Sequence, residues 1–158
     1  MDRFLLHVKI DYPSTGSERK ILELSRDEKN SKIKAFENPL TQSQLNKARA
    51  AVRDVRMSEQ VEEYLVQIIL ATRNSDKYGG NLSDWLEFGA SPRATIALDI
   101  CSKSLAWLDN RNFVTPDDIR SIAHDVLRHR LILSFEAEAN GISSDQVVDE
   151  LLKVVPSA

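Results

Sequence analysis

The sequence is poor in the residues that cross-link or interrupt small folds. It has one cysteine, five glycines and five prolines in 158 residues. Because Cys101 is alone, it cannot form an internal disulfide, which agrees with a reducing compartment. The apolar runs are a few residues long, far below the roughly 18 residues that cross a bilayer. The start also lacks a basic stretch leading into a long apolar segment. We therefore expect a cytoplasmic protein with no membrane span and no secretory signal.

Neither sign of charge dominates the composition. Lysine and arginine total 21 against 24 aspartate and glutamate residues, which gives a net charge of −3. Such a balance is a weak electrostatic basis for gripping a phosphate backbone, so we expect no nucleic-acid partner. Hydrophobic residues make up 42% and charged residues 28%. That composition and length favour one globular domain with a core of its own.

Motifs for phosphate, metal and nucleophilic chemistry are missing as well. A phosphate-binding loop needs Gly, four residues, Gly, Lys and Ser or Thr, and no segment matches. The three histidines and Cys101 lack ligand spacings such as His-x3-His, so we expect no metal site. His124 and His129 are instead expected to have structural roles. No Gly-x-Ser-x-Gly turn is present, so the residues support no hydrolase argument.

Signals for helix starts divide the chain into amphipathic segments. A Ser or Thr followed three residues later by Glu, Gln or Asp can satisfy the free amides at a helix start. Two further starts use Ser58 with Glu59, and Ser91 followed by Pro92. Apolar residues follow each start at helical spacing, which predicts an all-α fold, a small helical bundle. The four paired signals are Thr15 with Glu18, Thr41 with Gln44, Thr115 with Asp118, and Ser143 with Gln146.

Two regions depart from the helical pattern. Asn74 to Ala90 is rich in glycine and asparagine and is predicted to be a loop. Phe4 to Ile10 alternates in character and stops at Asp11-Tyr12-Pro13, which predicts a β-strand. Only Arg130 to Leu133 offers a second, short β-like run, and two strands alone are marginal in water. We therefore interpret Phe4 to Ile10 as a strand without its neighbours and infer that the chain begins partway through a larger unit.

Two arginines are candidate binding residues. Arg93 follows Pro92 at a helix start, where free amides and a guanidinium together suit a phosphate oxygen. The alternative is a solvated surface arginine, tolerated at small cost beside the positive end of the helix dipole. Arg3 lies at the entry to the predicted strand, and its alternative is an ion pair with Asp2 or a frayed terminus.

A cluster of large apolar side chains precedes Arg93. Trp85, Leu86 and Phe88 lie in the predicted loop. They either fold back on the core of the bundle or dock against another part of the assembly.

Several strings of this sequence together resemble MoxR-type AAA+ ATPases, in the magnesium-chelatase-related branch. The segment from Asp2-Arg3-Phe4-Leu5 to Asp11-Tyr12-Pro13-Ser14 resembles the last strand of the ATPase core and its exit. Gly89-Ala90-Ser91-Pro92-Arg93-Ala94 resembles the sensor-2 motif. Each string is weak alone, but their order and spacing are specific. Later lid helices are similar to Val114 to Ile119, Val126 to Leu131, Glu136 to Ala139, and Gly141-Ile142 onward to about Val155.

The resemblance implies that the chain is the C-terminal helical lid of such an ATPase, preceded by the final strand of its core. Residues 1–13 would be that strand, 14–40 a connecting helix and linker, and 41–158 the lid. Arg93 would be the sensor-2 arginine, which reports the γ-phosphate of ATP. Arg3 would be the candidate arginine finger, acting on nucleotide held by a neighbouring subunit. The forked guanidinium suits both roles.

Cofactors and partners follow from the same resemblance. ATP and Mg²⁺ are expected in the parent protein and none for the chain alone, which is not expected to hydrolyse ATP. The implied partners are the missing N-terminal ATPase core, neighbouring subunits of a ring, and proteins with von Willebrand factor A domains. The implied work is chaperone-like remodelling or metal insertion. The alternative is a self-contained helical protein-protein interaction module with an ordered N-terminal segment, whereas an orphan strand would fray or pair with another copy.

Overall fold

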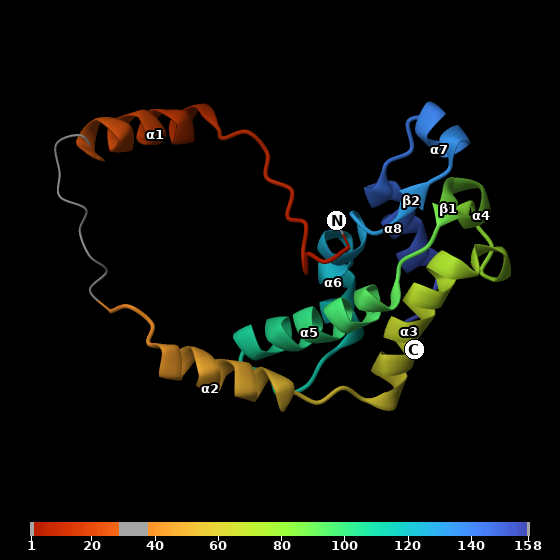
Figure 1. Ribbon diagram of the computed structural model, residues 1–158, viewed down its shortest axis with the longest axis horizontal. Helices are drawn as coiled ribbons and strands as arrows, with labels where there is room; N and C mark the ends of the chain where they lie inside the picture. Colours follow the sequence, from red (N-terminus) through yellow and green to blue (C-terminus); the bar gives the residue numbers. More distant parts are fainter. Residues whose placement is uncertain (1, 29–37, 158) are drawn as a thin grey trace.

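Helices account for most of the residues that the computed structural model describes, 2–28 and 38–157 (Figure 1). The predicted all-α helical fold is confirmed. In chain order the elements are α1 (Thr15–Glu28), α2 (Gln42–Arg53), α3 (Glu59–Arg73), the 3₁₀ helix η1 (Ser75–Lys77), α4 (Leu82–Trp85), β1 (Leu86–Phe88), α5 (Pro92–Leu108), α6 (Pro116–Leu127), β2 (Ile132–Leu133), α7 (Phe135–Ala139) and α8 (Ser144–Val154).

Side chains cap the starts of the helices at most of the predicted positions. Each capping oxygen accepts an amide of the first turn that would otherwise lack a partner. At α1 the cap differs from the prediction, because Ser14 Oγ rather than Thr15 accepts the amide of Ser17, at 3.4 Å. The predicted caps that accept a first-turn amide are Thr41 at α2, Ser58 at α3, Ser91 at α5 and Ser143 at α8.

The start of α6 is held by a buried carboxylate. Asp118 is 5% exposed and accepts hydrogen bonds from the amide of Thr115 at 2.7 Å and from its hydroxyl at 2.9 Å. Arg111 donates to the two oxygens of the same carboxylate at 2.8 and 2.5 Å. Burial alone would raise the pKa of Asp118, but these donors hold it below its ordinary value. The predicted pair of Thr115 and Asp118 therefore also ties the loop before α6 to the helix.

Four helices enclose the core with one face each. α5 packs mainly against α6, while α8 lies against α3 and α6, and α2 packs along α5 (Figure 1). The apolar spacings in the sequence predict these faces, and the burial confirms them. Side chains with no exposed surface include Ile68 of α3, Leu98 of α5, Leu127 of α6 and Leu151 of α8.

The segment predicted as a loop, Asn74 to Ala90, contains η1, α4 and β1, so that prediction was wrong. β1 pairs antiparallel with β2, with Leu86 opposite Leu133 and Phe88 opposite Ile132. The partner strand lies far along the chain, and local turn residues carry no signal for such pairing. The short β-like run at Arg130 to Leu133 does supply β2.

The strand predicted at Phe4 to Ile10 does not form. Residues 6–14 have no regular secondary structure, and the segment leaves its apolar side chains exposed, Ile10 by 87%. A strand needs a neighbour to take up its amides and carbonyls, and the described residues offer none, because β2 pairs with β1. The segment instead crosses the end of α6 and leads to α1, which lies apart from the bundle (Figure 1).

The apolar cluster before Arg93 is divided between core and surface. Leu86 is 9% exposed, and Trp85 is partly buried against the core. Phe88 remains 59% exposed. Folding back is therefore correct for Trp85 and Leu86 and wrong for Phe88.

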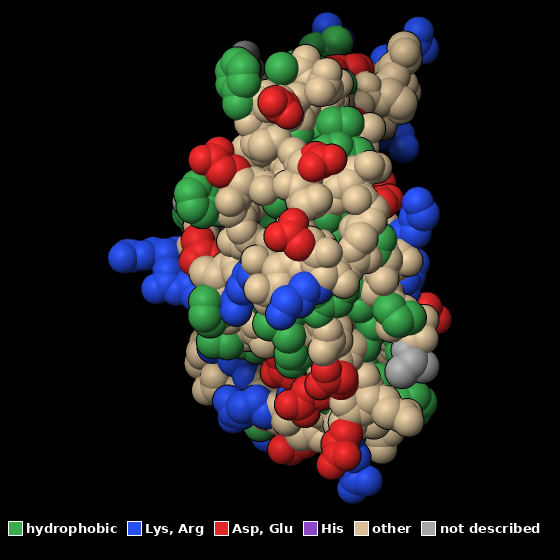
Figure 2. Space-filling view, turned by 90° about the vertical axis from the view of Figure 1, so that its right-hand side faces the viewer, with side chains coloured by type: hydrophobic (Ala, Val, Ile, Leu, Met, Phe, Trp, Pro, Cys, Tyr) green, Lys and Arg blue, Asp and Glu red, His purple; other side chains and the backbone are tan. Residues whose placement is uncertain are grey.

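The surface mixes both signs of charge. On the face shown in Figure 2, acidic and basic side chains alternate with apolar and neutral groups, without a broad patch of either sign. Over residues 2–28 and 38–157, no helix combines the length and apolarity needed to cross a membrane.

Replacing Leu98 by alanine tests the core. Leu98 is fully buried between α5 and its neighbours, so Leu98→Ala should lower the free energy of unfolding by about 2–5 kcal/mol in urea titrations. Leu24→Ala on α1 is the matched control, because Leu24 is 62% exposed, and it should change stability by no more than about 0.5 kcal/mol. Equal effects of the two substitutions would contradict this core.

Candidate functional site

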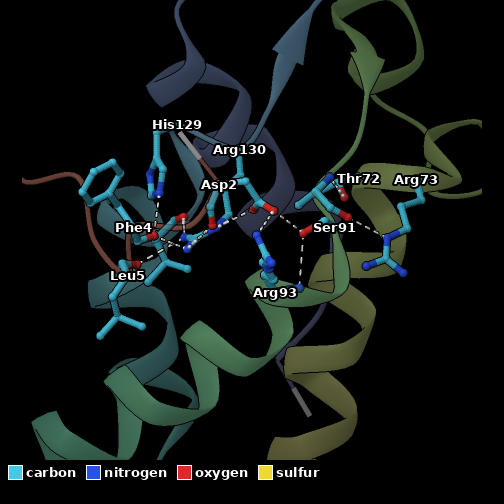
Figure 3. Close-up of polar contacts among 11 residues, drawn as sticks. Asp2, Phe4, Leu5, Thr72, Arg73, Ser91, Arg93, His129 and Arg130 are labelled. Atoms are coloured by element: carbon cyan, nitrogen blue, oxygen red, sulfur yellow. Dashed lines mark hydrogen bonds and ion pairs between the residues drawn. The ribbon is translucent and has the colours of Figure 1, made fainter.

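The start of α5 is fixed against the end of α3. The amide of Ala90 donates to Thr72 Oγ1 at 3.0 Å, and Arg73 Nε donates to the carbonyl of Ala90 at 2.7 Å (Figure 3). A Cβ on Gly89 would lie 2.2 Å from the carbonyl oxygen of Thr72, so only glycine allows this approach. These contacts set where α5 begins and therefore where Arg93 lies.

Arg93 stands at the N-terminus of α5 with much of its side chain in solvent. Ser91 Oγ accepts the amide of Arg93 at 3.2 Å and donates to Asp2 Oδ2 at 2.9 Å. The Arg93 side chain is 57% exposed, and its Nη1 lies 3.9 Å from Asp2 Oδ2. The guanidinium is thus held loosely, in the first turn of a helix, where both the helix dipole and the side chain favour an anion.

Asp2 joins the N-terminal segment to two helices. Its Oδ1 accepts from Arg130 Nε at 3.2 Å, while Oδ2 accepts from Ser91 (Figure 3). The hydrogen bond from Ser91 is the largest cause of a lowered pKa of Asp2, with Arg130 and Arg93 adding to it against the effect of burial. Among the described residues Asp2 pairs with these two arginines and not with Arg3, so the ion pair considered for Arg3 is not formed.

Arg130 is the most deeply buried charge at this site, with 2% of its side chain exposed. Nε donates to Asp2 Oδ1. Nη1 donates to the carbonyls of Leu5, at 3.2 Å, and Val126, while Nη2 donates to those of Asp2, at 3.4 Å, and Phe4. All five N–H groups of the guanidinium therefore have acceptors. Helical spacing gave no reason to single out Arg130, because it lies past the end of α6.

Arg128 and His129 hold the same segment beside Arg130. Arg128 Nη1 donates to the carbonyl of His7 at 2.5 Å, and His129 Nε2 lies 3.1 Å from the carbonyl of Phe4. The amide of His7 donates to the carbonyl of Asp125 at 2.8 Å. The structural role predicted for His129 is confirmed, and His124 likewise bonds Asp149 at 3.0 Å within the fold.

The structure brings both candidate arginines to one small cavity. Arg3 and Arg93 line it together with Arg130 and a single acid, Asp2. The cavity has a volume of about 130 Å³, and its apolar wall is formed by Leu5, Ile96 and Ala97. Three guanidinium groups against one carboxylate leave an excess of positive charge, which favours an anion such as a phosphate group.

Comparison with known proteins agrees with the helical bundle and its arginine at the start of α5. Residues 83–151 match the AAA lid domain family. The chain is 32% identical over 98% of its length both to the chaperone MoxR1 of Mycobacterium tuberculosis and to the uncharacterized protein YeaC of Bacillus subtilis. A solved structure from Cytophaga hutchinsonii, described as an ATPase, superposes on 99% of the chain with a TM-score of 0.88 and 33% identity.

These matches define the bundle as an AAA lid domain, a component of AAA+ ATPases. The relatives are MoxR proteins, and the chain belongs to this MoxR-type AAA+ group, as its motifs predict. The chain spans 40% of the length of MoxR1, 45% of YeaC and 47% of the Cytophaga protein.

Acid should weaken the attachment of the N-terminal segment. Desolvation is the largest cause of a lowered pKa of His129. The folded state then favours the neutral ring, so its contribution to stability is complete above the ordinary histidine pKa of about 6.5 and is lost as the pH falls through the lower folded value. Asp2, Asp118 and Asp145 also have lowered pKa values, and their contributions are lost only in stronger acid, below about pH 4.

His129→Gln tests this assignment. The free energy of unfolding should fall between about pH 7.5 and about pH 5, and the fall should be smaller in His129→Gln, because glutamine does not titrate. Asp2→Asn is the control and should keep the full fall, since the carboxyl of Asp2 stays ionised over this range. Urea titrations at each pH measure both, and an unchanged fall in His129→Gln would contradict the assignment.

Proposed function

We propose that the chain is the lid of a MoxR-type ATPase and that Arg93 is its sensor-2 arginine. The observation that supports this role is the position of Arg93 in the first turn of α5, 57% exposed and held only by a contact of 3.9 Å with Asp2. A γ-phosphate can compete with so long a contact, because a charge-assisted hydrogen bond is shorter and stronger. ATP and Mg²⁺ would be held mainly by the ATPase core.

Arg3 is the candidate arginine finger. It is exposed, and it lines the same cavity as Arg93. Two guanidinium groups that open into one small cavity are placed to act on phosphate oxygens of one nucleotide. If Arg3 acts on nucleotide bound by a neighbouring subunit, Arg93 of the same lid acts there too.

The division of the chain supports docking on an ATPase core. We propose that residues 1–13 belong to that core, 14–40 connect it to the lid, and 41–158 form the lid. The exposed apolar residues of the N-terminal segment and of α1 would then be covered by the core or by a neighbouring subunit of a ring. Among α1 residues, Ile21, Leu22 and Leu24 are 51%, 52% and 62% exposed. Remodelling of proteins with von Willebrand factor A domains, or metal insertion, is the proposed work of a cytoplasmic assembly.

A groove favours a second candidate function, a helical protein-protein interaction module. The groove lies between α2 and α5, and its volume is about 700 Å³. Its apolar wall includes Leu45, Val52, Ile100, Trp107 and Leu108. A partner helix could bind there without ATP.

Arg93→Ala in the full-length ATPase tests the proposed function. Loss of one preorganised donor to a developing charge commonly costs about 100-fold or more, so turnover at saturating ATP should fall by about that factor. Lys153→Ala is the control, because Lys153 is 76% exposed at the far end of α8, and its turnover should be unchanged. Normal hydrolysis by Arg93→Ala would remove the sensor role and leave the interaction module as the better account.

Mixing subunits tests whether both arginines serve one nucleotide. Rings assembled from Arg3→Ala and Arg93→Ala subunits should stay inactive, because every site receives both side chains from one lid and lacks one of them. If the two arginines of a lid served different sites, some sites in mixed rings would receive both. Recovered ATP hydrolysis in mixed rings would therefore contradict the shared cavity as the functional unit, whereas mixing either variant with wild-type subunits should restore activity.

A further inference from the structure

The backbone around Arg3 is held by side chains from the end of α6 and not by a sheet. Arg130 bonds carbonyls on both sides of Arg3, those of Asp2 and Phe4, and also the carbonyl of Leu5 and the carboxylate of Asp2 (Figure 3). Arg3 itself projects from the segment so held and is exposed. Its location therefore depends on the residues that anchor its neighbours.

Arg130 also connects Arg3 to Arg93. Asp2 accepts from Arg130 with one oxygen and faces Ser91 and Arg93 with the other. The two exposed arginines therefore meet at one cavity through a buried pair, Arg130 and Asp2. A network of this kind sets relative positions, because each member has little freedom to move alone.

From these contacts we infer that Arg130 is a positioning residue for ATP hydrolysis: it fixes Arg3 in the cavity that Arg93 shares. This role rests on the proposed function of Arg3 and Arg93. Arg130 does not itself reach a nucleotide, since its five N–H groups are already bonded within the chain.

The chemistry of this anchor requires arginine. Lysine keeps the charge but has three donors on one nitrogen, and it cannot serve five acceptors arranged around a planar fork. Arg130→Lys should therefore release the segment while leaving a cation in place. A displacement of about 1 Å in a group that stabilises the transition state can cost about 100-fold in rate, so even a small release should be measurable.

Hydrogen exchange in the 158-residue chain measures the attachment without ATP. The amide of His7 bonds the carbonyl of Asp125, so its exchange rate reports whether the segment is docked. In Arg130→Lys this amide should exchange at least about tenfold faster, while amides of α3 and α5 keep their protection. The matched control is Arg120→Lys, because Arg120 lies on α6 and bonds Tyr64 and Leu152, away from the segment. His7 should stay protected in that control.

Turnover of the full-length ATPase measures the positioning. Arg130→Lys should lower kcat by about tenfold or more with little change in the KM for ATP, and Arg120→Lys should not. In an Arg3→Ala background, Arg130→Lys should cause no further loss, because it acts through Arg3. A merely structural role would lower turnover in both backgrounds alike, and that result would overturn the inference.

A second variant covers the case in which Arg130→Lys also exposes the amides of α3 and α5. Arg128→Gln removes the bond to the carbonyl of His7 from a partly exposed side chain, and the same two measurements apply. Unchanged protection of His7 in both variants would overturn the inference. Full turnover in Arg3→Ala would overturn the proposed role of Arg3 and this role with it, whereas full turnover in Arg130→Lys alone would overturn only the positioning.

Discussion

A buried arginine paired with one aspartate organises this end of the molecule. Arg130 has 2% of its side chain exposed, and leaving such a charge without acceptors would be costly. The N-terminal segment supplies four of its acceptors, including the carboxylate of Asp2, and α6 supplies the fifth. The fold therefore satisfies a buried cation and places the exposed Arg3 in the same step.

The elements that depend on local chemistry could be predicted from the sequence. Caps such as Thr41 with Gln44 and Ser143 with Gln146 act within one helical turn, so their spacing alone reveals them. Arg93 could be found for the same reason, because Ser91 and Pro92 mark the helix start beside it. The motif resemblance added the roles of Arg93 and Arg3, which no spacing implies.

What could not be predicted depends on contacts between distant parts of the chain. The alternation at Phe4 to Ile10 is a genuine strand pattern, but a pattern does not state whether a partner strand is present. Arg130 has no periodic signal, and its acceptors at Asp2 and Phe4 lie more than a hundred residues away. β1 was missed for the same reason, because its partner β2 follows α5 and α6.

The central claim is that one lid delivers Arg3 and Arg93 to one nucleotide. A structure of the full-length ATPase with a non-hydrolysable ATP analogue tests it most directly. Both guanidinium groups should lie within hydrogen-bond distance of phosphate oxygens of the same analogue, with Arg130 still bonded to the carbonyls around Arg3. If Arg93 points into solvent, or the two arginines contact different nucleotides, the account is wrong.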